Sequence, residues 1–431
     1  MDEPLIQAPY RWAGDPFADD VIVAVIGLGQ SWIQGGSKAP ADPVCTPEPE
    51  HPGLALELDT RPRPTPGYTP RLVDLHERFG SRRERPLSGC ADAIERGLLA
   101  MTGRARPLIT ITSARGGSTL KGGLIPNDGL TPGSFVYQWM LTQVGYVVDL
   151  VRPQGKRLIV VSIVAAHGET DAQLGQPGRG FAEGWSEVRR QAEADIRGLT
   201  GQSEAVLLHI YQTTGLNRRF KPATPPEGRH WIGDVAWWQL RITEFDPLCR
   251  CVGPVYWIER GEGDPVHAGN RSLRRIGLQF GRYVFEDIYG SGREALRIKE
   301  VAWVGPRRLR VEYGREIAVE TDDRLVNVTA LGIAKGYAIA CAEGEDTPAI
   351  TGFDRSDGQS RGFDLTLERA PRAPGARLLA ASHPTGLGIG RDTSARTAVR
   401  SLQPLDRDPQ DGFALHDWAC VESVALPAAD D

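Results

Sequence analysis

Three polar blocks stand where a parallel α/β sheet would present its reactive groups. Each block follows a run of apolar, mostly β-branched residues that is typical of a buried strand. In open α/β sheets, ligands bind at the carboxyl ends of the strands, so we expect the three blocks to meet at one edge. They are Gly29-Gln30-Ser31, His167-Gly168-Glu169-Thr170-Asp171 and Asp264-Pro265-Val266-His267.

Serine, histidine and aspartate at these places suit nucleophilic catalysis. We predict Ser31 as the nucleophile, His267 as its general base and Asp264 as the residue that orients the imidazole. An Asp three residues before a His can meet its ring, fix its tautomer and support the imidazolium. Taken singly, a Gly-x-Ser block is often a plain turn and an Asp-x-x-His block a helix cap, so the prediction depends on the blocks meeting.

The alternation of strand and helix patterns predicts the α/β class. Five strand patterns alternate with helical spacing, which favours a parallel sheet with helices on both faces. The predicted strands span 21–26, 108–112, 157–164, 205–211 and 251–258. The predicted helices span 91–101, 134–151, 181–199, 231–242 and 272–288.

Two segments do not follow this alternation of strands and helices. Residues 39–85 are rich in proline, arginine and acids, and we interpret them as a long loop insertion that could cover a site. After residue 290 short alternating strands predict a C-terminal β-rich, sandwich-like domain. Its strands are expected at 296–304, 308–313, 325–332, 337–341, 362–367 and 377–381. The predicted domains are therefore 1–290 and 291–431.

The composition and charge of the chain limit the kinds of partner and environment that we expect. Net charge is -5 and no long basic run occurs, which argues against nucleic-acid binding. No apolar window of about 18 residues predicts a membrane span. The acidic start, Met1-Asp2-Glu3, lacks the apolar core of a secretory signal, so we expect a cytoplasmic protein unless a signal was trimmed. Six scattered cysteines are too sparse for a disulfide scaffold. The oligomeric state is left open.

The ordered blocks resemble the SGNH hydrolases, in their sialate O-acetylesterase and acetylxylan-esterase-like branch. A fourth block, Ser113-Ala114-Arg115-Gly116-Gly117-Ser118, falls where that family places an oxyanion-hole glycine. The resemblance covers about residues 20–285. It implies a three-layer α/β/α, flavodoxin-like fold and ester hydrolysis through an acyl-serine. It also implies a short acyl group, most commonly acetyl, on a small-molecule or glycan substrate.

The resemblance assigns further roles to individual residues. It implies that the N–H groups of Ser31 and Gly116, or alternatively Gly117, hold the oxyanion. His167 stands where the family has glutamine, and it is the candidate for a third donor if its tautomer is right. Gln30, Trp32 and Glu169 are candidate substrate contacts. No metal or other cofactor is expected.

Two other classes of function compete with this prediction. A zinc nucleobase deaminase also uses His-x-Glu, here His167-Gly168-Glu169, but the spacing of Cys249 and Cys251 does not fit its second motif. The chain could also be a non-catalytic glycan- or protein-binding module on a degenerate hydrolase fold. The intact serine, aspartate and histidine set argues against that alternative.

Overall fold

The computed structural model contains a seven-stranded sheet built as the strand patterns predict. It describes residues 18–35, 43–59, 69–77, 83–122, 129–213, 234–259, 267–320, 334–341, 347–355, 360–371, 375–381 and 397–428. The strand order is β3-β2-β4-β1-β5-β6-β7, and every neighbouring pair is parallel except β2 with β3. The strands are β1 (Val21–Gly29), β2 (Ala55–Leu58), β3 (Leu72–Asp74), β4 (Leu108–Ala114), β5 (Arg157–Ala165), β6 (Leu207–Gln212) and β7 (Cys249–Pro254).

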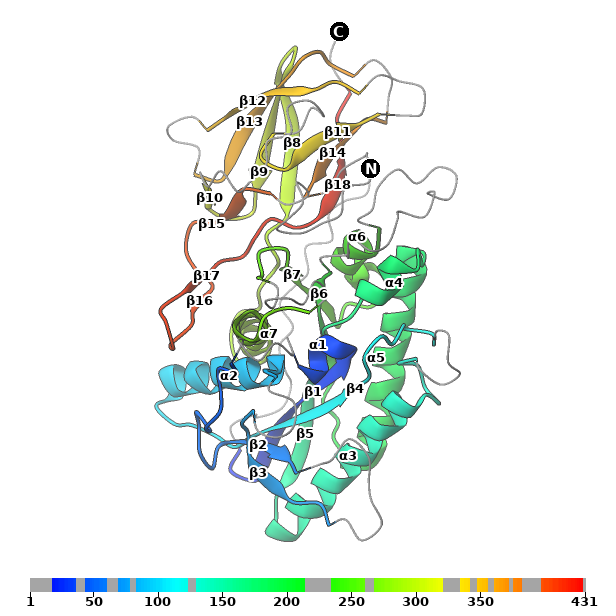
Figure 1. Ribbon diagram of the computed structural model, residues 1–431, viewed down its shortest axis with the longest axis vertical. Helices are drawn as coiled ribbons and strands as arrows, with labels where there is room; N and C mark the ends of the chain where they lie inside the picture. Colours follow the sequence, from blue (N-terminus) through cyan, green and yellow to red (C-terminus); the bar gives the residue numbers. More distant parts are fainter. Residues whose placement is uncertain are drawn as a thin grey trace.

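Helices cover both faces of this sheet (Figure 1). Side chains of β1 alternate between two hydrophobic clusters, because successive residues of a strand point to opposite faces. Val21, Val23 and Val25 pack with residues of α2 and α7, whereas Ile22 and Ile26 pack with residues of α3 and α5. The helices are α1 (Ser31–Gln34), α2 (Pro86–Thr102), α3 (Phe135–Val151), α4 (Glu169–Gln173), α5 (Gly178–Thr200), α6 (Asp234–Leu240) and α7 (Asn270–Ile288).

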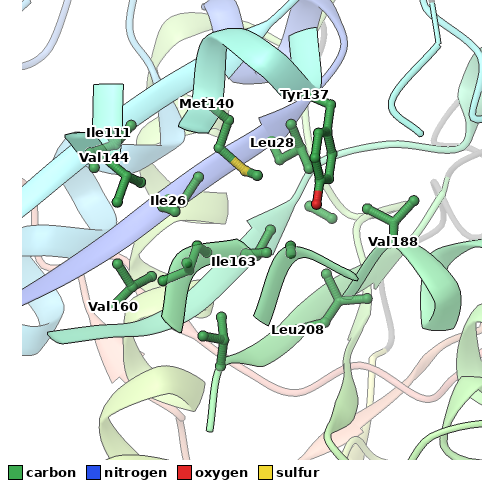
Figure 2. Close-up of a cluster of buried hydrophobic side chains, with 14 of the residues drawn as sticks. Ile26, Leu28, Ile111, Tyr137, Met140, Val144, Val160, Ile163, Val188 and Leu208 are labelled. Carbon is green, nitrogen blue, oxygen red and sulfur yellow. The ribbon is translucent and has the colours of Figure 1, made fainter. Parts of the chain in front are cut away.

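Figure 2 shows the cluster on the α3 and α5 face. Ile26 and Leu28 of β1 and Ile163 of β5 point from the sheet toward Tyr137 and Met140 of α3. All five side chains are buried. Because this cluster continues to the last residues of β1, the carboxyl end of that strand is held as firmly as its middle.

Helices α2 and α7 lie unusually close together on the other face. A Cβ added at Gly89 of α2 would lie 2.1 Å from the carbonyl oxygen of Arg274, and one at Gly277 of α7 would lie 2.0 Å from that of Pro86. Only glycine permits backbones to approach this closely. The start of α7 therefore has a fixed place against α2.

The chain after α7 forms antiparallel sheets. One has the order β12-β13-β9-β8 and another the order β11-β14-β18, and both contribute to one hydrophobic cluster that contains Val311, Phe363, Ile339 and Leu378. Two short pairs, β10 with β15 and β16 with β17, complete the described strands. Their bounds are β8 (Ile298–Gly305), β9 (Arg308–Tyr313), β10 (Ile317–Val319), β11 (Tyr337–Ala340), β12 (Ile350–Asp354), β13 (Gly362–Leu367), β14 (Arg377–Ala380), β15 (Val399–Ser401), β16 (Asp406–Arg407), β17 (Ala414–Leu415) and β18 (Glu422–Ala425).

The β-rich region contacts the α/β region directly. The Gln212 side chain, at the end of β6, donates to the carbonyl oxygen of Val421 at 2.7 Å and accepts from its N–H at 2.9 Å. The Tyr256 hydroxyl donates to the carbonyl oxygen of Ala419 at 2.7 Å. The segment around residue 420 thus lies against the carboxyl ends of the last two strands of the parallel sheet.

The predicted fold class is confirmed, with one difference inside the 39–85 insertion. The insertion contains β2 and β3, which extend the main sheet beyond β4, where a loop was expected. These strands are only four and three residues long, which is too short for a clear period. The strand expected at 325–332 lies outside the described residues, and the boundary near residue 290 stays a prediction.

Candidate active site

Ser31 lies at the carboxyl end of the central strand β1. It is the first residue of the short helix α1, and its side chain is partly exposed. Gln30 before it is extended, with φ −106° and ψ −155°, so the chain turns sharply from strand to helix at the serine. A serine on such a turn is presented outward from the sheet edge, where a substrate can reach it.

The structure brings the predicted oxyanion glycine beside the predicted nucleophile. A Cβ added at Gly116 would lie 3.6 Å from the Cβ of Ser31, and Gly116 itself is exposed. The Gln34 amide donates to the carbonyl oxygen of Ala114 at 2.8 Å, and the Arg115 N–H donates to that of Gly29 at 3.2 Å. These bonds tie α1 to the loop after β4, so the two backbone segments are held at a fixed spacing.

Gln30 and Glu169 form hydrogen bonds to each other inside the protein. The Gln30 amide donates to one Glu169 oxygen at 2.6 Å and accepts from the Thr170 hydroxyl at 2.9 Å. The Tyr211 hydroxyl donates to the other Glu169 oxygen at 2.8 Å. These bonds hold the Gln30 and Glu169 side chains in place, and their predicted contact with substrate stays a prediction. Tyr211, at the end of β6, was not foreseen from the sequence.

Trp32 packs into the core behind the serine. Its side chain is 2% exposed, and its ring centroid lies 5.9 Å from that of Tyr211. The expectation that Trp32 forms a substrate wall is corrected by this burial. Consecutive helical residues point about 100° apart, so the neighbour of an outward serine turns inward.

His167 is fully buried and both of its ring nitrogens have partners. Nε2 lies 3.0 Å from the carbonyl oxygen of Ser118, to which it donates, and Nδ1 accepts from the Trp185 indole at 3.4 Å. The ring also stacks on Phe181 with a centroid distance of 5.6 Å. Burial lowers the pKa of His167 to about 4, so the ring is neutral at pH 7.

These contacts correct the prediction that His167 is a third oxyanion donor. A neutral imidazole has one N–H, and that of His167 is directed to Ser118. The ring instead fixes the loop that carries Gly116. Asp171, whose pKa burial raises to about 7, holds the same loop by accepting from the N–H of Leu120.

His267 stands between β7 and α7 along the chain. It stands three residues before Asn270, the first residue of α7, and it is partly exposed. Its neighbour Ala268 belongs to the same buried hydrophobic cluster as Trp32 and Ile33, which directly follow Ser31. Asp264 lies outside the described residues, so its orienting role stays a prediction.

A second serine, histidine and aspartate set is present that the sequence did not reveal. The Ser162 hydroxyl lies 2.7 Å from Nδ1 of His209, and Nε2 of His209 lies 3.0 Å from the Asp287 carboxylate. The Arg250 guanidinium is 3.5 Å from the same carboxylate. The three side chains are 0%, 0% and 2% exposed, so a substrate has no access to them.

Metal ligands and membrane spans are both missing from the part of the chain that the structure describes. Within it, no three His, Cys, Asp or Glu side chains gather as metal ligands would. None of the helices in the described ranges is long and apolar enough to cross a bilayer.

Comparisons with known proteins found similar structures but no match in sequence. No protein-family model and no curated protein sequence matches the chain. A carbohydrate acetylesterase from Xanthomonas citri is similar over 93% of this chain and 80% of its own, with 13% identity and a TM-score of 0.56. An Arabidopsis thaliana protein matches over 61% of this chain and 98% of its own, with 15% identity and a TM-score of 0.44. An aryl esterase of M. smegmatis matches over 61% and 97%, with 13% identity and a TM-score of 0.34.

The similarity to the Xanthomonas protein establishes the shared fold. Its coverage of 93% of this chain extends into the β-rich region as well as the parallel sheet. The protein therefore has a three-layer α/β/α unit that is followed by a β-rich region.

Proposed function

We propose that the chain is a serine-dependent ester hydrolase that removes acetyl groups from carbohydrate. The observation that carries the proposal is the position of Ser31 at the carboxyl end of β1, partly exposed and beside Gly116. Within an SGNH-like fold this is the edge where ligands bind. The fold shared with a carbohydrate acetylesterase supports the class of reaction and the class of substrate.

The reaction proceeds through an acyl-serine. Ser31 Oγ attacks the ester carbonyl while His267 takes the hydroxyl proton, and Asp264 orients the imidazole. The carbonyl π electrons move to oxygen, and the backbone N–H groups of Ser31 and Gly116 bind that oxyanion. The intermediate then collapses, the sugar alcohol leaves with the proton from His267, and the acetyl group stays on Ser31.

Water completes the cycle. His267 takes a proton from a water molecule, which attacks the acetyl carbonyl, and a second tetrahedral intermediate forms at the same N–H groups. Its collapse returns the proton to Ser31 and releases acetate. Each oxyanion donor of this kind is typically worth about 3 kcal/mol of the barrier. Because the N–H of His167 donates to Ser118, the proposal depends on the backbone N–H groups of Ser31 and Gly116.

The first test is hydrolysis of p-nitrophenyl acetate by the wild-type chain and by Ser31→Ala. We expect the wild type to release p-nitrophenol and the variant to lose on the order of 10⁴-fold in kcat/KM. Equal rates for the two proteins would overturn the assignment of Ser31. A wild-type chain without activity that still binds glycan would support the non-catalytic alternative.

The second test concerns the substrate. A panel of acetylated and chemically deacetylated glycans is incubated with the wild type and with Ser31→Ala, and released acetate is measured. We expect acetate only from the acetylated glycans and only with the wild type. Hydrolysis of p-nitrophenyl acetate without acetate release from any glycan would keep the esterase and reject the carbohydrate.

A further inference from the structure

A hairpin of the β-rich region docks on α2 and on α7, the helix that follows the predicted general base. It consists of β16, β17 and the residues between them, and Figure 1 shows it beside α2 and α7. Asp406 at its start pairs with Arg96 of α2 through two bonds of 3.1 and 2.9 Å. Leu415 at its end is buried with Ala93 of α2 and Leu278 of α7.

The contact of the hairpin with α7 is centred on Arg274. This side chain is 0% exposed, and its guanidinium pairs with Glu50 at 2.7 Å, Asp92 at 3.1 Å and Asp408 at 3.3 Å. Asp408 is the hairpin's contribution and is itself 0% exposed. A buried guanidinium needs such partners in place, so the hairpin fixes the position of this arginine on α7.

Arg274 is linked in turn to the start of α7. Its guanidinium lies 3.4 Å from the Thr46 hydroxyl, which donates to the Glu84 carboxylate at 2.5 Å. The Glu84 N–H donates to the Asn270 side chain at 2.9 Å, and Asn270 is the first residue of α7. Buried bonds therefore run from the hairpin to the helical turn that follows His267.

The same Glu84 touches the end of the serine helix. A Cβ added at Gly35, which closes α1, would lie 3.3 Å from the Glu84 carbonyl oxygen. Residue 84 thus lies between the end of the helix that begins with Ser31 and the start of the helix that follows His267. A displacement of one helix relative to the other would require Glu84 to move, and Thr46 and Arg274 hold it in place.

We propose that Asp408 is a positioning residue for His267, through which the β-rich region sets the geometry of the active site. Asp408 holds Arg274, and Arg274 with Thr46 and Glu84 holds the first turns of α7 against α1. The proposal rests on the proposed function, because it assigns His267 as the base. Catalysis is sensitive to misplacement of about 1 Å, so loosening α7 lowers the rate of the chemical step.

The test compares Asp408→Asn with a matched control, Asp364→Asn. Asp364 is also a buried aspartate of the β-rich region, 1% exposed and paired with Arg308 and Arg310, but those partners lie on β9, within the same region. We expect Asp408→Asn to lower kcat for p-nitrophenyl acetate about tenfold with KM within about twofold. Asp364→Asn keeps kcat within about twofold. Equal kcat in both variants and the wild type would overturn the proposal.

A second readout does not depend on catalysis. Hydrogen–deuterium exchange of the amides of residues 268–276 is expected to quicken several-fold in Asp408→Asn and to stay at the wild-type rate in Asp364→Asn. If the wild type lacks Ser31-dependent hydrolysis, the proposed function fails while exchange still tests the link from hairpin to helix. Unchanged exchange in Asp408→Asn overturns that link even in an active enzyme.

A milder variant covers the case in which Asp408→Asn does not fold. Thr46→Val keeps the shape of the side chain and removes only the hydroxyl that links Arg274 with Glu84. We expect kcat to fall several-fold with KM unchanged and the exchange of residues 268–276 to quicken. Wild-type kcat and exchange in this variant would reject the chain of contacts.

Discussion

The two serine, histidine and aspartate sets in this chain differ in access more than in chemistry. In the buried set, Ser162, His209 and Asp287 are joined in series by bonds of 2.7 and 3.0 Å, although Nδ1 faces the serine and Nε2 the aspartate, the reverse of the ring orientation in a catalytic relay. In the other set, Ser31 and His267 are partly exposed at the carboxyl edge of the sheet. The buried set has the more complete geometry and yet cannot receive a substrate.

The two sets also differ in what surrounds the serine. Ser31 has the exposed Gly116 beside it, where backbone N–H groups can meet an oxyanion. Ser162 lies in the middle of β5, where its backbone pairs with β1 and β6. Asp287 and Asn270 are 17 residues apart on α7, so the two sets lie near opposite ends of a helix about 25 Å long. Hydrogen-bonded geometry without an opening therefore indicates a structural role.

After Ser31→Ala, the largest effect is expected from His267→Gln. If His267 is the general base, kcat/KM for p-nitrophenyl acetate falls about 10³-fold, because the serine proton has no acceptor. The free energy of unfolding in urea changes by less than about 1 kcal/mol, since the side chain is partly exposed. His76→Gln, a partly exposed histidine after β3, is the control and keeps its activity. Comparable rates for the two variants would remove His267 from the mechanism.

The opposite result is expected for Ser162→Ala. The hydroxyl is hydrogen-bonded to a buried imidazole nitrogen, so its loss leaves that nitrogen without this partner and lowers the free energy of unfolding by about 1–2 kcal/mol. The value of kcat/KM stays within about twofold of the wild type. Urea unfolding and p-nitrophenyl acetate hydrolysis measure the two quantities. A large loss of activity with unchanged stability would mean that a substrate can reach Ser162.

The sequence predicted the strands better than the contacts between distant side chains. The expected strands 308–313 and 362–367 have the bounds observed for β9 and β13, because alternation of apolar and polar residues is a local signal. A different local signal, the continuous apolar run 21–26, placed Ser31 just after a central strand. Strands β2 and β3 were not predicted because they are short and lie in a proline-rich segment.

Side-chain partners that are far apart in sequence could not be predicted. Ser162, His209 and Asp287 share no local motif, and only the parallel order of β5 and β6 beneath α7 brings them together. The contact of Asp408 with Arg274 spans 134 residues and depends on the docking of the hairpin. Trp32 was misplaced for a different reason: adjacency to Ser31 in sequence does not set the direction of a helical side chain.

His167→Gln is expected to change activity only slightly, and it tests which of the two sets His167 resembles. Glutamine is the residue of the SGNH pattern at this position, and its amide can also donate to Ser118. If His167 is structural, like His209, then kcat/KM stays within about threefold and the free energy of unfolding at pH 8 falls by about 1 kcal/mol.

The pH dependence of stability sharpens this test. The folded protein holds the pKa of His167 near 4, below the ordinary value of 6.5, because burial disfavours the charged ring. Between these values the unfolded chain binds a proton that the folded protein does not. The stability that His167 contributes is therefore complete above pH 6.5 and is lost as the pH falls toward 4.

Compared with His167→Gln, the wild type loses at most about 3 kcal/mol more across that window. Asp171, with a pKa near 7, lies 3.5 Å from Nε2 of His167 and titrates in the upper part of the same pH range. Parallel unfolding curves from pH 4 to 8, together with a loss of kcat/KM near 100-fold, would instead place His167 with Ser31 as a donor to the oxyanion.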